Sequence, residues 1–68
     1  MTDTDRAILA ALDLPPRERD YRARELGLSP TAYAQRALVL LDTPEAEREF
    51  PAQVHRWRRI MDDLRRRR

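Results

Sequence analysis

The side chains with the clearest chemical capacity in this 68-residue chain are its arginines. All 14 basic residues are arginine and none is lysine, although a bias toward GC-rich codons would give the same composition. Each guanidinium is a planar fork of N–H donors that can hold a phosphate or the edge of guanine through two hydrogen bonds. Residues 56–68 carry seven arginines and a net charge of +5, whereas residues 1–55 carry a net charge of −3. This clustering favours a polyanionic partner, and we expect double-stranded DNA.

A second group of polar side chains, between residues 29 and 36, has the chemistry to read base pairs. Gln35 can bind adenine and Arg36 can bind guanine, each through two hydrogen bonds, and Ala32 can contact a thymine methyl group. The alternative is that Gln35 and Arg36 are ordinary surface residues. The full set of predicted DNA-contacting residues is Ser29, Thr31, Ala32, Gln35, Arg36, Arg56, Arg59, Arg65, Arg66, Arg67 and Arg68.

Residue types that enzymes commonly use are scarce. His55 is the only histidine and there is no cysteine, which excludes a Cys–His pair and a His-rich metal site. Asp62 and Asp63 are adjacent, but neighbouring side chains on a helix point about 100° apart and cannot share a proton. With one glycine, Gly27, the chain cannot form a glycine-rich phosphate loop. We therefore expect no catalytic activity and no metal or other cofactor.

Proline and the spacing of apolar residues indicate the helices that must position these side chains. A proline is well tolerated at the first position of a helix, where its missing N–H costs nothing, and a preceding Ser or Thr can cap that helix. The residues predict an all-α fold, a small bundle of four helices in a single domain covering residues 1–68. The predicted helices are Asp5 to Asp13, Pro16 to Leu26, Pro30 to Leu41 and Pro51 to Arg66, with a short helical turn ending at Glu49. Thr2 or Thr4 can cap the first of them.

Apolar residues that recur at helical spacing predict the core. The strongest stripe, in the last helix, steps by four, three, four and three residues. It suits packing on the other helices, and its a/d spacing equally suits a homodimer seam. The predicted buried side chains are Ala7, Ile8, Ala11, Leu12, Tyr21, Ala23, Leu26, Tyr33, Ala37, Leu40, Leu41, Phe50, Val54, Trp57, Met61 and Leu64.

Residues 23–42 predict a helix-turn-helix. Gly27 can adopt the left-handed conformation that ends a helix, and Ser29 can cap the next one. Ala23 places a small side chain where the two helices must cross. In the DNA-binding form of this motif the second helix enters the major groove. The alternative is a plain helical corner, which is common in small bundles.

The order of these features resembles a family of short actinobacterial proteins of unassigned function that are predicted to carry a helix-turn-helix. The matching residues are Leu26-Gly27-Leu28-Ser29-Pro30-Thr31, Tyr33, Gln35, Leu40-Leu41-Asp42, Pro44-Glu45-Ala46, the arginine-rich end after Val54, and Asp5-Arg6-Ala7-Ile8-Leu9 at the start. The Leu-Gly-Leu-Ser step is also similar to the DNA-reading region of sigma factors. The chain departs from the family pattern at Ala32, Ala34, Ala37 and Leu38, where larger or more polar residues are expected.

Taken together, these features predict a DNA-binding helix-turn-helix protein that acts as a transcriptional or nucleoid-associated regulator. The alternative is a protein–protein adaptor that docks on RNA polymerase or a sigma factor, which the acidic body and basic end would also suit. We expect a cytoplasmic location and no membrane partner. No apolar run approaches the roughly 20 residues of a membrane span, and the N-terminus is acidic where a signal peptide is basic.

Overall fold

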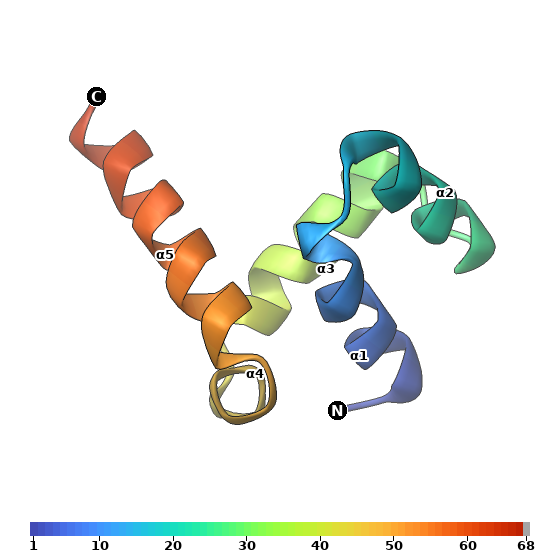
Figure 1. The fold of residues 1–68 in the computed structure, drawn as a ribbon, viewed down its shortest axis with the longest axis horizontal. Helices are drawn as coiled ribbons and strands as arrows, with labels where there is room; N and C mark the ends of the chain where they lie inside the picture. Colours follow the sequence, from blue (N-terminus) through green and yellow to red (C-terminus); the bar gives the residue numbers. More distant parts are fainter. Residues whose placement is uncertain (68) are drawn as a thin grey trace.

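The computed structural model describes residues 1–67 and is a small all-α bundle (Figure 1). Four helices correspond to the four that the sequence predicts, and the short helix α4 corresponds to the predicted turn. The first helix begins two residues earlier than predicted and its last turn tightens into a 3₁₀ helix. The elements are α1 (Asp3–Ala10), the 3₁₀ helix η1 (Ala11–Asp13), α2 (Pro16–Glu25), α3 (Pro30–Leu41), α4 (Pro44–Glu49) and α5 (Pro51–Arg66).

Hydroxyl side chains fix the starts of three helices: Thr2 caps α1, Ser29 caps α3 and Thr43 caps α4. The Thr2 hydroxyl accepts a hydrogen bond from the Asp5 N–H at 3.1 Å, and the Asp5 carboxylate accepts one from the Thr2 N–H at 3.3 Å. This reciprocal pair is a capping box, and it explains why α1 starts before Asp5. Ser29 accepts from the Ala32 N–H in the same way, which confirms Ser29 as the cap of α3.

The turn between α2 and α3 has the predicted construction. Gly27 has a φ of 76°, and no other residue in the described part of the chain has a positive φ. The Leu28 N–H donates to the Ala23 carbonyl at 2.9 Å, and the Gly27 N–H donates to the Arg24 carbonyl at 2.9 Å. These two bonds satisfy carbonyls at the end of α2 and turn the chain into α3. Ala23 is buried at the crossing of the two helices.

The core lies where α1 crosses α3. The Tyr33 hydroxyl of α3 donates a 2.6 Å hydrogen bond to the Ile8 carbonyl of α1, so these two helices are joined by a polar contact inside the apolar core. The buried apolar side chains are Ile8, Leu9, Ala11, Leu12, Ala23, Tyr33, Ala37, Leu40, Leu41, Ala46 and Val54. The predicted buried face of α3 is therefore confirmed.

Three predicted core positions are wrong. Ala7 is exposed, and Leu9, which was not predicted, is fully buried in its place. Tyr21 is 63% exposed because two residues on a helix lie about 200° apart, so the burial of Ala23 turns Tyr21 to solvent. Leu64 is 57% exposed.

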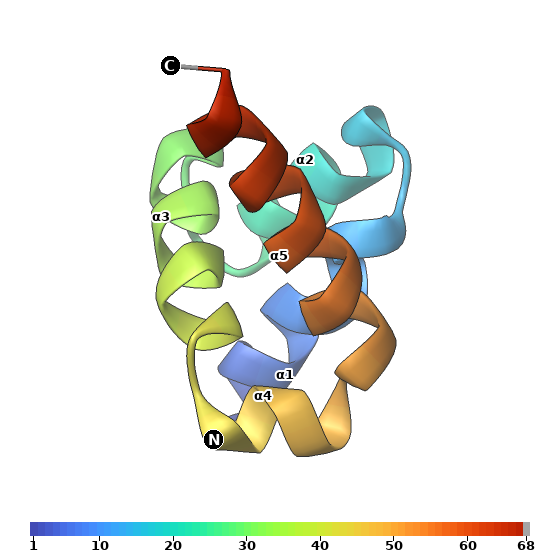
Figure 2. The same ribbon diagram turned by 90° about the vertical axis from the view of Figure 1, so that its left-hand side faces the viewer.

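The α5 helix returns in roughly the opposite direction to α3, and α4 connects the two (Figure 2). Its first turns pack on the core through Val54, which is buried. Its second half diverges from the corner formed by α2 and α3 (Figure 1). Along the described residues, no helix has both the length and the apolar character needed to cross a membrane.

Candidate nucleic-acid interface

The outward face of α3 carries the first group of predicted contacts. Tyr33 and Ala37 point into the core. At about 100° per residue, the opposite side of the helix carries Thr31, Gln35 and Val39 in one row. All three are exposed. The fold therefore brings Thr31 and Gln35 together on an open helical face.

Arg36 lies on the edge of α3 that faces α1. Its Nη2 is 3.2 Å from Oδ1 of Asp5, and its Nε is 3.4 Å from the same oxygen. Asp5 is only 7% exposed, whereas about half of the Arg36 side chain is exposed. The bonds to Asp5 use Nε and Nη2, and Nη1 makes no hydrogen bond within residues 1–67. Arg36 can therefore offer one guanidinium nitrogen to a partner while the rest of the group stays with α1.

The electrostatics of this contact favour the ionised carboxylate. Burial acts to raise the pKa of Asp5, but hydrogen bonds from the Thr2 N–H and from Arg36 outweigh it, and the pKa of Asp5 is lowered. The charge of Arg36 is thus partly neutralised inside the protein.

Ser29 and Ala32 have mainly structural roles. The Ser29 hydroxyl oxygen accepts a hydrogen bond from the Ala32 N–H at 3.1 Å and so caps the start of α3. The Ser29 side chain is exposed and its hydroxyl hydrogen can still reach a phosphate. Ala32 is half-buried beside the same edge as Arg36. Neither residue adds a long side chain to the outward row of α3.

The predicted arginines of α5 do not form one surface. Arg56 and Arg65 are nine residues apart, which places them on opposite sides of the helix, about 180° apart. Arg56 Nη1 lies 2.6 Å from Oδ1 of Asp13 in η1. Arg59 and Arg66 lie together on a third side, and Arg67 Nη2 is 3.3 Å from Asp63. Arg68 falls outside the described residues.

Arg65 is the predicted α5 arginine that the structure places beside α3. It lines a shallow hollow of about 260 Å³ between the two helices, together with Leu38, Asp42 and Arg58. Sequence reasoning missed Arg58, although its spacing of seven residues from Arg65 puts both on one face. The acidic side chains of Asp42 and Asp62 line the same hollow and limit how positive this surface can be.

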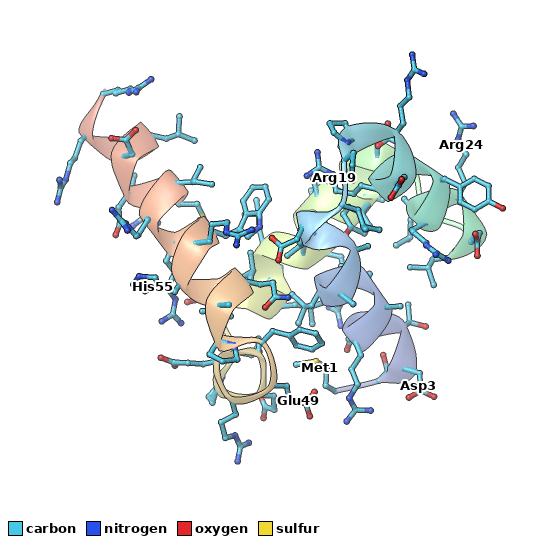
Figure 3. All side chains as sticks on the ribbon, in the orientation of Figure 1. Met1, Asp3, Arg19, Arg24, Glu49 and His55 are labelled. Carbon is cyan, nitrogen blue, oxygen red and sulfur yellow. The ribbon has the colours of Figure 1, made fainter. Side chains whose placement is uncertain are left out.

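Three other basic side chains lie away from this hollow. Figure 3 shows His55 on the outer side of α5 and Arg24 pointing into solvent from α2, whereas Arg19 is on the side of α2 that faces α5. In residues 1–67, no three His, Asp or Glu side chains are placed to hold a metal ion.

Comparison with known proteins places the whole chain within one family model. Residues 1–68 match the model described as a protein of unknown function, DUF3263. No curated protein matches the chain. No solved structure matches it either.

Proposed function

The chain belongs to the DUF3263 family of proteins of unknown function, and from its geometry we propose that it binds double-stranded DNA through its helix-turn-helix as a regulator of transcription or of nucleoid structure. The observation that carries this proposal is the open row of Thr31 and Gln35 on α3. The turn at Gly27 fixes that helix on α2, as the recognition helix is fixed in DNA-binding motifs of this kind.

In this proposal the base contacts come from the N-terminal part of α3. Gln35 binds an adenine edge, Thr31 supports it, and Ala32 meets a thymine methyl group at the side of the row. Arg36 contributes through Nη1, because its other nitrogens hold Asp5. Its share of the binding free energy is therefore smaller than that of an unpaired arginine.

Phosphate contacts come from the side of α5 that borders α3. Arg65 and Arg58 reach a backbone that lies along the hollow between the helices. Arg59 and Arg66 lie on the next side of α5 and reach the DNA backbone only where the duplex bends. Arg56 faces η1 instead. The affinity then depends on a small number of cations and weakens as salt rises.

The test is fluorescence anisotropy with labelled duplexes over a range of salt concentrations. We expect log K to fall with log salt by about 0.9 per phosphate contacted. Arg65→Ala should reduce this slope by about 1. Arg48→Ala, which removes the same charge from α4, is the matched control and should leave the slope unchanged. A chain that binds no duplex at low salt would overturn the proposal.

Base reading is tested separately with a selected site. Gln35→Ala should lose about 1–3 kcal/mol of preference for that site over a scrambled duplex. Gln53→Ala on α5 removes the same side chain from another surface and should keep the preference. Equal binding of all duplexes by the unaltered chain would leave a non-specific, nucleoid-type role.

The competing proposal is an adaptor that docks on RNA polymerase or a sigma factor. The observation that favours it is Val39, which is 59% exposed in the middle of the outward row of α3. An apolar side chain there suits a protein surface better than a base edge. Stoichiometric binding to purified polymerase holoenzyme, lost in Val39→Asp and accompanied by no affinity for DNA, would favour the adaptor.

A further inference from the structure

Residues 57–64 of α5 have an inverted charge pattern. They read Trp-Arg-Arg-Ile-Met-Asp-Asp-Leu. In the first half, two arginines stand between two apolar residues, and in the second half two aspartates stand between two apolar residues. When the segment is read backwards, every apolar position meets an apolar one and every basic position meets an acidic one. A helix with this property is complementary to an antiparallel copy of itself.

The apolar side of this segment is left partly uncovered by the fold. Ile60 is 42% exposed and Leu64 is 57% exposed, whereas Val54, two turns earlier in the same helix, is buried. Leu38 of α3, 46% exposed, lines the same hollow as Met61 and widens the apolar surface beyond a single helix. Figure 1 shows that this half of α5 stands apart from the α2–α3 corner.

We propose that two copies of the chain pair through the second half of α5, antiparallel about a two-fold axis that passes between Ile60 and Met61. In this register Ile60 packs on the partner's Met61. The partner's Leu64 lies opposite the part of Trp57 that stays exposed, because the rest of this half-buried side chain packs on the core of its own chain. The interface is isologous, as expected of a symmetric dimer.

The charges on both flanks of the stripe fit this register. Arg58 and Asp62 lie on one flank of α5, and Arg59 and Asp63 lie on the other, because each pair is four residues apart. A two-fold axis between antiparallel helices places each flank of one helix beside the same flank of the partner helix. Arg58 therefore meets the partner's Asp62, and Arg59 meets the partner's Asp63. Each of these pairs is one residue out of perfect alignment, about 1.5 Å along the helix.

Arg58 and Asp62 border the hollow beside α3, and the ion pairs that Arg58 and Asp63 make within the chain do not oppose the pairing. Arg58 is 3.5 Å from Glu47, and Asp63 is 3.3 Å from Arg67. Both are surface ion pairs, which contribute little to stability and exchange readily.

The inference does not rest on DNA binding, because the charge pattern and the exposure of Ile60 and Leu64 need no duplex. It does give Arg58 a partner other than the phosphate proposed above, so a dimer paired in this way contacts DNA without Arg58.

The first test is the mass of the full chain in solution, measured by sedimentation without DNA. We expect a concentration-dependent dimer between about 1 µM and 1 mM, the range typical of small interfaces. Leu64→Glu should raise the dissociation constant at least about tenfold. Glu45→Gln on α4 is the control and should leave it unchanged. A chain that remains monomeric over the whole range would overturn the proposal.

Charge exchange tests the partner and the pairing together. The variants R58D/R59D and D62R/D63R each place like charges against themselves and should be monomeric. Mixed in equal amounts, they should form a heterodimer, because each variant then offers the charges that the other lacks. Circular dichroism of each variant checks that α5 remains helical. Dimers of either variant alone, or no association in a mixture of folded variants, would refute the pairing.

Single cysteines test the orientation, since the chain has none of its own. Ile60→Cys lies beside the axis and should cross-link to its own copy on mild oxidation. Leu64→Cys faces the partner's Trp57 and should not. Cross-linking of both variants with equal efficiency would indicate parallel helices and would overturn the proposed geometry.

Discussion

Arg36 on α3 holds Asp5 on α1, with Nη2 3.2 Å from the carboxylate oxygen Oδ1, although 31 positions separate the two residues. The same carboxylate accepts the Thr2 N–H that closes the cap of α1. One nearly buried side chain thus fixes both the start of a helix and its contact with the candidate recognition helix. The position of α3 depends on this contact as well as on the core.

Replacing Asp5 by Asn should weaken the fold and change its response to acid. The pKa of Asp5 is lowered in the folded chain, so its contribution is present above the ordinary pKa and is lost as pH falls through the lower folded value. The free energy of unfolding of the parent chain should therefore decrease as the pH is lowered below about 4. The free energy of unfolding of Asp5→Asn should decrease less steeply over the same range.

Thermal unfolding at several pH values measures this effect. Asp3→Asn removes a neighbouring carboxylate that is fully exposed and should keep the parent profile. Some acid sensitivity should remain in Asp5→Asn, because a hydrogen bond from Arg6 also lowers the pKa of Glu49. Identical profiles for the parent chain and Asp5→Asn would show that the contact adds no ionic stabilisation.

A double-mutant cycle should show that Arg36 and Asp5 act as a unit. Arg36→Ala leaves a nearly buried carboxylate without its cationic partner and should lower the melting temperature. Adding Asp5→Asn to that variant should then cost less than Asp5→Asn costs alone. Additive losses, measured by urea unfolding, would mean that the two residues are not coupled.

The same cycle separates stability from DNA binding. If Arg36→Ala binds DNA more weakly only because α3 has moved, Asp5→Asn should weaken DNA binding as well. If Nη1 of Arg36 contacts the duplex directly, Arg36→Ala should weaken it and Asp5→Asn should not. Anisotropy on folded variants, at a temperature well below their melting points, distinguishes the two.

Gly27→Ala should destabilise the fold through backbone conformation alone. The φ of 76° is unfavourable for an L-residue with a Cβ, at a cost of about 1–2 kcal/mol. A Cβ at this position meets nothing within 4 Å, so no clash adds to that cost. Gly27→Asn should lose less, because Asn tolerates the left-handed region better. Equal losses in the two variants, measured by thermal unfolding, would contradict this explanation.

Leu9→Ala should leave the chain largely unfolded. Leu9 is fully buried, and its truncation creates a cavity that costs about 2–5 kcal/mol. The total stability of a small domain is often near 5 kcal/mol. Val39→Ala, at an exposed position, should change stability by no more than about 0.5 kcal/mol. A cooperative melt near the parent temperature for Leu9→Ala would show that the cavity collapses.

Much of the helical order could be predicted because it rests on local chemistry. Ser29 followed by Pro30 begins α3, and Gly27 ends the helix before it, through bonds that span five residues or fewer. The buried face of α3 was also predictable, because four large or apolar side chains repeat along it. Thr2 was one of the two predicted caps of α1, but the predicted first residue of that helix was two positions late.

The candidate site could be predicted only in part. Thr31 and Gln35 share a face because their separation of four residues is a local property of the helix. The pairing of Arg36 with Asp5 joins two distant segments, and no local pattern reveals it. Helical spacing alone predicts that Arg56 and Arg65 lie on opposite sides of α5. It does not predict which of the two lies beside α3.

The sequence by itself determined the helices, their caps and the turn at Gly27, because these depend on backbone bonds and side chains within a few positions. It also determined the inverted charge pattern of residues 57–64. Only the tertiary structure decided that Tyr21 faces solvent, that Arg36 is held by Asp5 and that Ile60 and Leu64 are left uncovered. Those outcomes depend on how the helices cross, and crossing is set by packing between segments far apart in the chain.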